Sequence, residues 1–121
     1  MEARRSFPAD VTSPRAARQF VGGLLGEPDG ETLQVALVLI SELVTNAVVH
    51  ARTQVDVRVE MGTDHLRVEV ADRDPRLPLP SAQAPDAPGG RGLFLVQELA
   101  TAWGTELCAG GKVVWFTLHS G

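Results

Sequence analysis

The sequence predicts an α/β (α+β) two-layer sandwich, in which a mixed, mostly antiparallel sheet carries three helices on one face. Two hairpins indicate the sheet. Residues 55–70 alternate between apolar and polar around a Gly-Thr-Asp turn, and residues 105–118 form a second hairpin around Gly110-Gly111. Three segments with apolar residues at helical spacing supply the other layer. At 121 residues, the chain fits one domain, 1–121.

The first half of the chain predicts a strand and two helices. Residues 2–7 form a short edge strand that stops at Pro8. A hydroxyl cap and a first-turn proline in Thr12-Ser13-Pro14 start a helix that ends near Gly26. A turn then leads into a long second helix, roughly Glu31 to Ala51.

The second half predicts a hairpin, a long loop, a helix and a closing hairpin. The strand that follows the Gly-Thr-Asp turn ends near Asp72. Five prolines between residues 75 and 88 exclude a helix or a central strand there, and a loop of this length is commonly a lid or disordered. The third helix starts in Gly90-Arg91-Gly92-Leu93 and runs to about Trp103-Gly104.

A polar stripe interrupts the second helix. Glu42, Asn46 and His50 are four residues apart, and each such step turns about 40° past a full circle, so the three fall near one face. Residues 33–40 are apolar on nearly every side, which indicates a helix buried between layers. A buried carboxylate and amide either hydrogen-bond within the core or line a cavity that admits water, a cation or a ligand.

Composition excludes several classes of function. The net charge is -4 and the arginines are scattered, so the sequence predicts no direct contact with nucleic acid. No uninterrupted apolar run approaches the length needed to cross a bilayer, and we expect a cytoplasmic protein without membrane contact. Cys108 is the only cysteine, which excludes an intramolecular disulfide and a Cys-rich metal site.

Several features together point to a nucleotide site. The turn Gly89-Gly90-Arg91-Gly92 opens a helix, whose free N–H groups and positive dipole end suit phosphate oxygens. Asp72 ends a strand, where its carboxylate could accept a hydrogen bond from an exocyclic amine. Asn46 offers a neutral oxygen to Mg²⁺, and Glu42 could orient or deprotonate a nucleophile. Taken singly, each has a structural explanation: a helix-surface pair, a strand-end turn and a flexible loop.

In this order and at this spacing, the motifs resemble those of a known family. Glu42-x-x-x-Asn46-x-x-x-His50-Ala51, then Asp72, then Gly90-x-Gly92-Leu93 are similar to the three nucleotide-binding boxes of the GHKL ATPases. That superfamily includes DNA gyrase B, histidine-kinase catalytic domains and mismatch-repair ATPases. The resemblance of this chain to it implies the Bergerat fold from about Phe7 to Leu118. The short chain looks most like the stand-alone anti-sigma factor serine/threonine kinases of actinobacteria.

The resemblance implies a role for each matched residue. Asn46 would coordinate Mg²⁺ that bridges the ATP phosphates, Asp72 would bind the adenine amino group, and Glu42 would be the general base. The phosphates would meet Gly90, Arg91, Gly92 and Leu93, beneath a flexible lid at 73–90. His50 would brace the helix or touch nucleotide. The implied partners are a sigma factor and an anti-sigma factor antagonist, and the N-terminal edge strand is compatible with a homodimer.

Three functional hypotheses remain open at the level of sequence. The first is an ATP- and Mg²⁺-dependent protein kinase that also sequesters a sigma factor, which Glu42 and Asn46 favour. The second is a non-catalytic interaction module on the same fold, favoured because residues 73–76 lack the glycines of the family's usual Asp-x-Gly-x-Gly. The third, an ATP-hydrolysing or histidine-phosphorylating domain, normally needs further domains.

Overall fold

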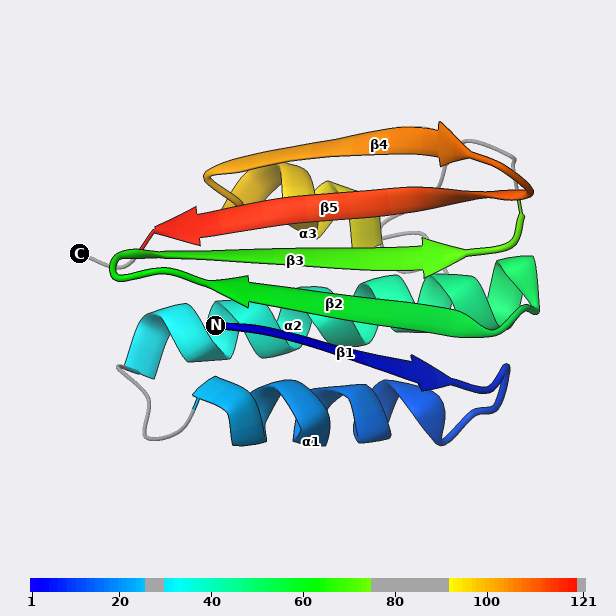
Figure 1. Ribbon diagram of the computed structural model, residues 1–121, viewed down its shortest axis with the longest axis horizontal. Coiled ribbons are helices and arrows are strands. Elements are labelled where there is room, and N and C mark those ends of the chain that lie inside the picture. The colour runs from blue at the N-terminus through cyan, green and yellow to red at the C-terminus, as the bar shows by residue number, and fades with distance from the viewer. Residues whose placement is uncertain (26–29, 75–91, 120–121) are drawn as a thin grey trace.

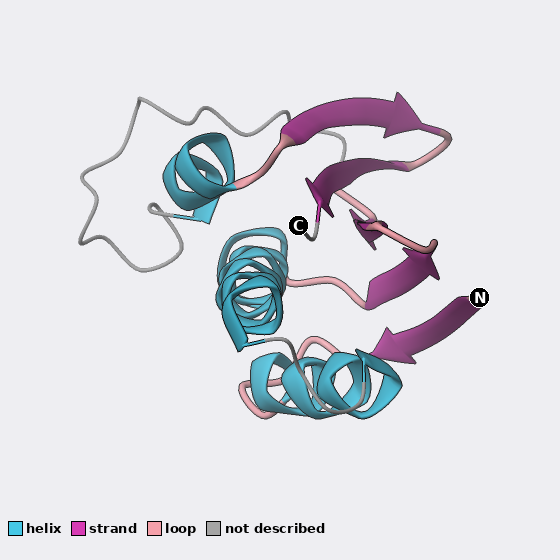
Figure 2. Cartoon of the chain, turned by 90° about the vertical axis from the view of Figure 1, so that its left-hand side faces the viewer, coloured by secondary structure: helices cyan, strands magenta, loops and turns pink. Residues whose placement is uncertain are grey.

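All the described helices lie on one face of a five-stranded sheet in the computed structural model (Figures 1 and 2). The structure describes residues 1–25, 30–74 and 92–119. The elements in chain order are β1 (Glu2–Phe7), α1 (Ser13–Leu25), α2 (Gly30–Asn46), the π-helical turn η1 (Ala47–Ala51), β2 (Val55–Met61), β3 (His65–Asp72), α3 (Gly92–Leu99), β4 (Ala102–Cys108) and β5 (Gly111–His119). The predicted two-layer architecture is confirmed.

The sheet has the strand order β1-β2-β3-β5-β4, and all four pairings among the described strands are antiparallel. The predicted sheet was mixed and mostly antiparallel. Its antiparallel character is confirmed, and no parallel pairing occurs among the described strands. β1 and β4 form the two edges, which confirms the predicted N-terminal edge strand. β5 lies between β3 and β4, so the closing hairpin extends the sheet formed by the first hairpin.

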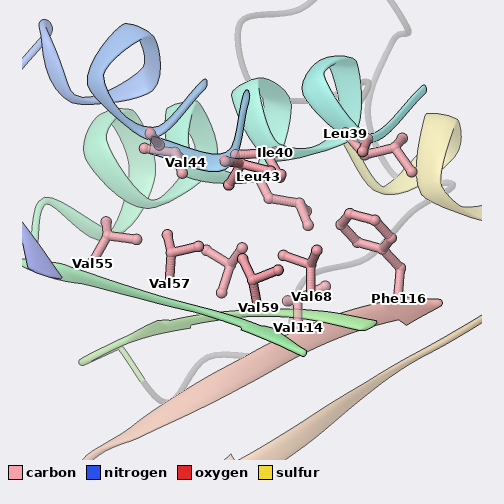
Figure 3. Close-up of a cluster of buried hydrophobic side chains, with 14 of the residues drawn as sticks. Leu39, Ile40, Leu43, Val44, Val55, Val57, Val59, Val68, Val114 and Phe116 are labelled. Carbon is pink, nitrogen blue, oxygen red and sulfur yellow. The ribbon is translucent and has the colours of Figure 1, made fainter. Parts of the chain in front are cut away.

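The core lies between α2 and the inner face of the sheet. Figure 3 shows Leu39, Ile40, Leu43 and Val44 of α2 facing valines of β2 and β3 and Phe116 of β5. On the sheet side, the alternation of apolar and polar residues places these side chains on the inner face, because every second side chain of a strand points to the same face. The central valines are fully buried, and each such side chain stabilises the fold by roughly 1.5–3 kcal/mol relative to exposure.

The apolar character of α2 follows from its central place among the helices. By length and composition alone, the helical segment Glu31–Ala51 would suffice to cross a membrane. In the fold, α2 lies between α1 and α3 and also covers the sheet (Figure 2). A helix with neighbours on three sides needs apolar residues on more than one face, which explains the composition of residues 33–40.

The third helix is shorter than predicted. It ends at Leu99, and Trp103 and Gly104 belong to β4. In the register of β4 and β5, Trp103 lies opposite Phe116 and Gly104 lies opposite Trp115. These cross-strand neighbours supply the packing that draws the segment into the sheet, and no local pattern in the sequence reveals them.

The outer face of the sheet carries charged side chains instead of a second layer of helices. Arg58 donates hydrogen bonds to Glu2 at 2.8 Å, to Glu60 at 3.2 Å and to Glu69 at 3.1 Å. The bond from Arg58, opposed by some desolvation, lowers the pKa of Glu2 below its ordinary value of 4.5. The same bond raises the pKa of Arg58. The network joins the three strands β1, β2 and β3.

Candidate functional site

Two residues of the predicted polar stripe lie on α2 as expected. Glu42 and Asn46 are both half-buried, one turn apart near the C-terminal end of the helix. The Oδ1 atom of Asn46 is hidden from solvent and has no hydrogen-bond partner among the described residues. A buried amide oxygen without a donor is costly, so it calls for a ligand, a water molecule or a cation.

The helix changes character immediately after Asn46. Residues Ala47–Ala51 form a π-helical turn, closed by a hydrogen bond of 2.7 Å from the Arg52 N–H to the Ala47 carbonyl. Arg52 then adopts the left-handed conformation, with φ of 57°. Such turns are rare and occur frequently at functional sites. The turn places His50 on an exposed position, so the stripe does not continue as a buried row.

Asp72 ends β3 on the inner face of the sheet, in phase with the buried Val68 and Val70. Its carboxylate is 9% exposed and forms an ion pair with Lys112 of β5, whose Nζ lies 3.0 Å from Oδ2 and 3.1 Å from Oδ1. The N–H of Asp74 donates to Oδ1 at 2.8 Å. The carboxylate is thus held in place and already paired.

The ends of α2 and β3 lie at the same end of the molecule (Figure 1). One hydrogen bond joins the segments that follow them, because the N–H of Arg73 donates to Oγ1 of Thr53 at 3.1 Å. α3 runs away from this end toward the start of β4, so its N-terminus points in the direction of the ends of α2 and β3 (Figure 1). The fold therefore brings the segments of Asn46 and Asp72 to one end of the layered structure, with the N-terminus of α3 directed toward them.

Part of the predicted site lies outside the described residues. Gly90 and Arg91 are in this part, and so is the predicted lid from residue 75 onward. Gly92 begins α3 as predicted, and Leu93 follows it in the helix. Residues 73 and 74, which the prediction included in the lid, are hydrogen-bonded through their N–H groups to Thr53 and Asp72.

Lys112 is the residue that the sequence-based prediction missed. It is the only lysine in the chain, and it is 8% exposed. The signal was present in the alternation of β5, because Lys112 is in phase with Val114, Phe116 and Leu118, which are all buried. A lysine in a row of buried residues requires an anionic partner.

The described residues contain no group of three or more His, Cys, Asp or Glu side chains able to hold a metal ion. A Mg²⁺ ion commonly keeps several waters and is bound by one or two protein oxygens together with substrate phosphates. The unpartnered Oδ1 of Asn46 fits one such ligand position. Asn46 is the described residue best suited to that role.

Two comparisons with known proteins give matches. A family model described as the histidine kinase-like ATPase domain matches residues 7–118. The structure is similar to that of the RsbU and RsbW domains of Rv1364c from Mycobacterium tuberculosis, with a TM-score of 0.74 and 20% sequence identity. The match covers 98% of this chain and 32% of that chain, so this chain spans about a third of it. No curated protein matches the chain.

Proposed function

The chain belongs to the family of histidine kinase-like ATPase domains, and from that premise we propose that it is an ATP- and Mg²⁺-binding anti-sigma regulatory protein with serine/threonine kinase activity. The observation that carries the proposal is the buried, unpartnered Oδ1 of Asn46, at the end of the molecule where β3 also ends with Asp72. The likeness to a structure with an RsbW domain supports the anti-sigma class.

Each residue has a defined part in this proposal. Asn46 would hold Mg²⁺, which would supply positive charge against the phosphates. Asp72 would accept a hydrogen bond from the exocyclic amine of adenine in competition with Lys112, and the N-terminus of α3 would meet phosphate oxygens. Glu42 accepts the proton of the attacking serine or threonine hydroxyl as its oxygen bonds to the γ-phosphorus and the bond to ADP breaks. The phosphorylated protein is an anti-sigma factor antagonist, and a sigma factor is the second partner.

The first test is calorimetric titration with ATP in the presence and absence of Mg²⁺. We expect binding that depends on Mg²⁺ and is lost in Asn46→Ala. The matched control is Gln34→Ala, an exposed position on the same helix, which should bind as the unmutated chain does. Equal binding by Asn46→Ala and Gln34→Ala would refute the role of Asn46.

Phosphotransfer is tested with γ-labelled ATP and the anti-sigma factor antagonists of the source organism as acceptors. Loss of a general base typically costs 10²–10⁴-fold, roughly, so Glu42→Gln should lose transfer on that scale while retaining ATP. Glu31→Gln removes a carboxylate from the exposed first turn of the same helix and should leave the rate unchanged.

A non-catalytic interaction module is the second candidate, because the carboxylate of Asp72 is already paired with Lys112. Such a module would bind its partner with the same affinity with and without ATP. It would also keep that affinity in Glu42→Gln and Asn46→Ala. Partner binding that changes with nucleotide would exclude it.

A further inference from the structure

The ion pair of Asp72 and Lys112 spans the inner face of the sheet. The two residues lie directly opposite each other in the register of β3 and β5. Their side chains are 9% and 11% exposed. The ammonium donates to the carboxylate and, at 3.0 Å, to the carbonyl oxygen of Asp74. Three acceptor atoms therefore surround an ammonium that has three hydrogens, so its donors are satisfied within the protein.

The acceptor capacity of Asp72 is largely used. Oδ1 lies near both the ammonium of Lys112 and the N–H of Asp74, and Oδ2 lies near the ammonium. Any hydrogen bond to the ionised carboxylate is charge-assisted, and the ammonium adds the attraction between opposite charges, which a neutral donor lacks. A neutral amine that approaches this carboxylate must therefore compete with a stronger, resident donor.

The backbone on both sides fixes the pair. Gly111 precedes Lys112, and a Cβ atom there would overlap the carbonyl oxygen of Asp72 and lie 3.0 Å from the Cα of Arg73. Glycine at this position lets the end of β3 pack closely against β5. The N–H of Arg73 is held by Thr53. The backbone at both ends of the pair is thus held in place, so only the lysine side chain needs to move for the ammonium to leave the carboxylate.

We propose that Lys112 sets the nucleobase selectivity of this site by competing with the exocyclic amine of adenine for the carboxylate of Asp72. The inference rests on the proposed nucleotide-binding function. A bare carboxylate attracts the amine of adenine and repels the carbonyl that guanine carries at the same position, whereas a neutralised pair does neither strongly. The chain consequently binds ATP and GTP with similar affinity, and loss of the lysine restores a preference for ATP.

The test is titration with ATP and with GTP, each with Mg²⁺, for the unmutated chain and for Lys112→Met. Methionine keeps an apolar stem of similar length and removes the charge. We expect the two affinities to differ by less than about tenfold in the unmutated chain, and the ATP-to-GTP ratio to rise by about tenfold or more in Lys112→Met, equivalent to one strong hydrogen bond. If Lys112 had a purely structural role, Lys112→Met would lower the affinity for ATP and for GTP by the same factor.

The matched control is the double variant Asp72→Leu with Lys112→Met, which removes both charges and should show no gain in the ratio. Since Lys112 is the only lysine, isotopically labelled lysine provides a second readout. Its single side-chain signal should shift on addition of ATP if the amine displaces the ammonium. Should Lys112→Met fail to fold, Lys112→Gln, which keeps one neutral donor, decides the question by the same ratio.

The outcomes separate the two proposals. Absence of binding by the unmutated chain and by the variants would refute the proposed nucleotide function and this inference with it. Binding with an unchanged ATP-to-GTP ratio in Lys112→Met would overturn this inference alone. A strong preference of the unmutated chain for ATP would do the same.

Discussion

The indole ring of Trp115 lies across Gly104 on the neighbouring strand, so close that a Cβ on Gly104 would be 2.8 Å from ring atoms Cε2, Cζ2 and Nε1. The ring in turn lies beneath the guanidinium of Arg67, 4.3 Å from its Cζ. The absence of a side chain at Gly104 thus leaves room for the aromatic ring on the outer face of the sheet. This contact joins the edge strand β4 to the interior of the sheet.

Gly104→Val is expected to lower the free energy of unfolding by about 1–3 kcal/mol, the usual cost of an overpacked site. Valine favours strands, so the loss would come from the displaced ring and not from backbone propensity. Urea unfolding followed by circular dichroism measures the change. The double variant Gly104→Val with Trp115→Val should recover part of the lost stability. If it recovers none, the contact with the ring is not the cause of the loss.

Gly23→Ala should have the opposite effect on the free energy of unfolding. Gly23 is exposed on α1, and a Cβ there would meet nothing within 4 Å. Alanine in a helix interior is favoured over glycine by roughly 0.5–1 kcal/mol, because glycine loses more conformational freedom on folding. The free energy of unfolding should rise by that amount in the same urea experiment. A decrease would mean that α1 is packed more tightly than the structure shows.

Lys112→Met is expected to destabilise the fold by about 3–5 kcal/mol, because it leaves the carboxylate of Asp72 buried without its counter-charge. The double variant with Asp72→Leu should be closer to the unmutated chain, since two apolar side chains need no partner. Chemical unfolding of the three proteins gives the comparison. If the double variant were the least stable, the pair would contribute net stability beyond the cost of an orphaned charge.

The bond between Glu2 and Arg58 predicts a dependence of stability on pH. The pKa of Glu2 is lower in the folded state than its ordinary value of 4.5, so the bond contributes fully above that value. The contribution is lost as the pH falls through the lowered pKa, when the carboxylate takes up a proton. Stability measured along an acid titration should show this loss.

Glu2→Gln should remove that part of the acid dependence, and Arg58→Gln should return the pKa of Glu2 toward 4.5 in a carboxyl NMR titration. High salt should weaken the effect, because Glu2 is 45% exposed at its side chain. Glu31→Gln, on α2, serves as the control. An acid profile that is identical in Glu2→Gln and the unmutated chain would show that the bond is absent in solution.

The fold was predictable because its signals are local. Alternation in β2 and β3, and the glycines at 110 and 111, define hairpins within a few residues of sequence. The two glycines nevertheless act differently: Gly110 adopts a positive φ of 78° in the turn, and Gly111 permits close approach of Asp72. The end of the third helix was wrong because Trp103 and Gly104 take their structure from β5, which comes later in the chain.

The site was predictable only in part. Glu42 and Asn46 depend on helical spacing, which the sequence displays directly. The pairing of Asp72 with Lys112 is not visible in local spacing. The two residues are 40 positions apart, and the register of β3 with β5 is needed to bring them together. The residues Ala47–Ala51 fit an α-helix as well as a π-turn by composition, so nothing in the sequence distinguishes the two.

The π-turn after Asn46 also affects how this chain is aligned with its relatives. A π-turn closes its hydrogen bond over five residues where an α-turn uses four, so it is the expected result of inserting one amino acid into an established helix. A relative whose helix remains regular would need a single-position gap between Asn46 and Arg52. Position numbers transferred across that gap would assign the role of His50 to the wrong residue, whereas Glu42 and Asn46, which precede it, would be matched correctly.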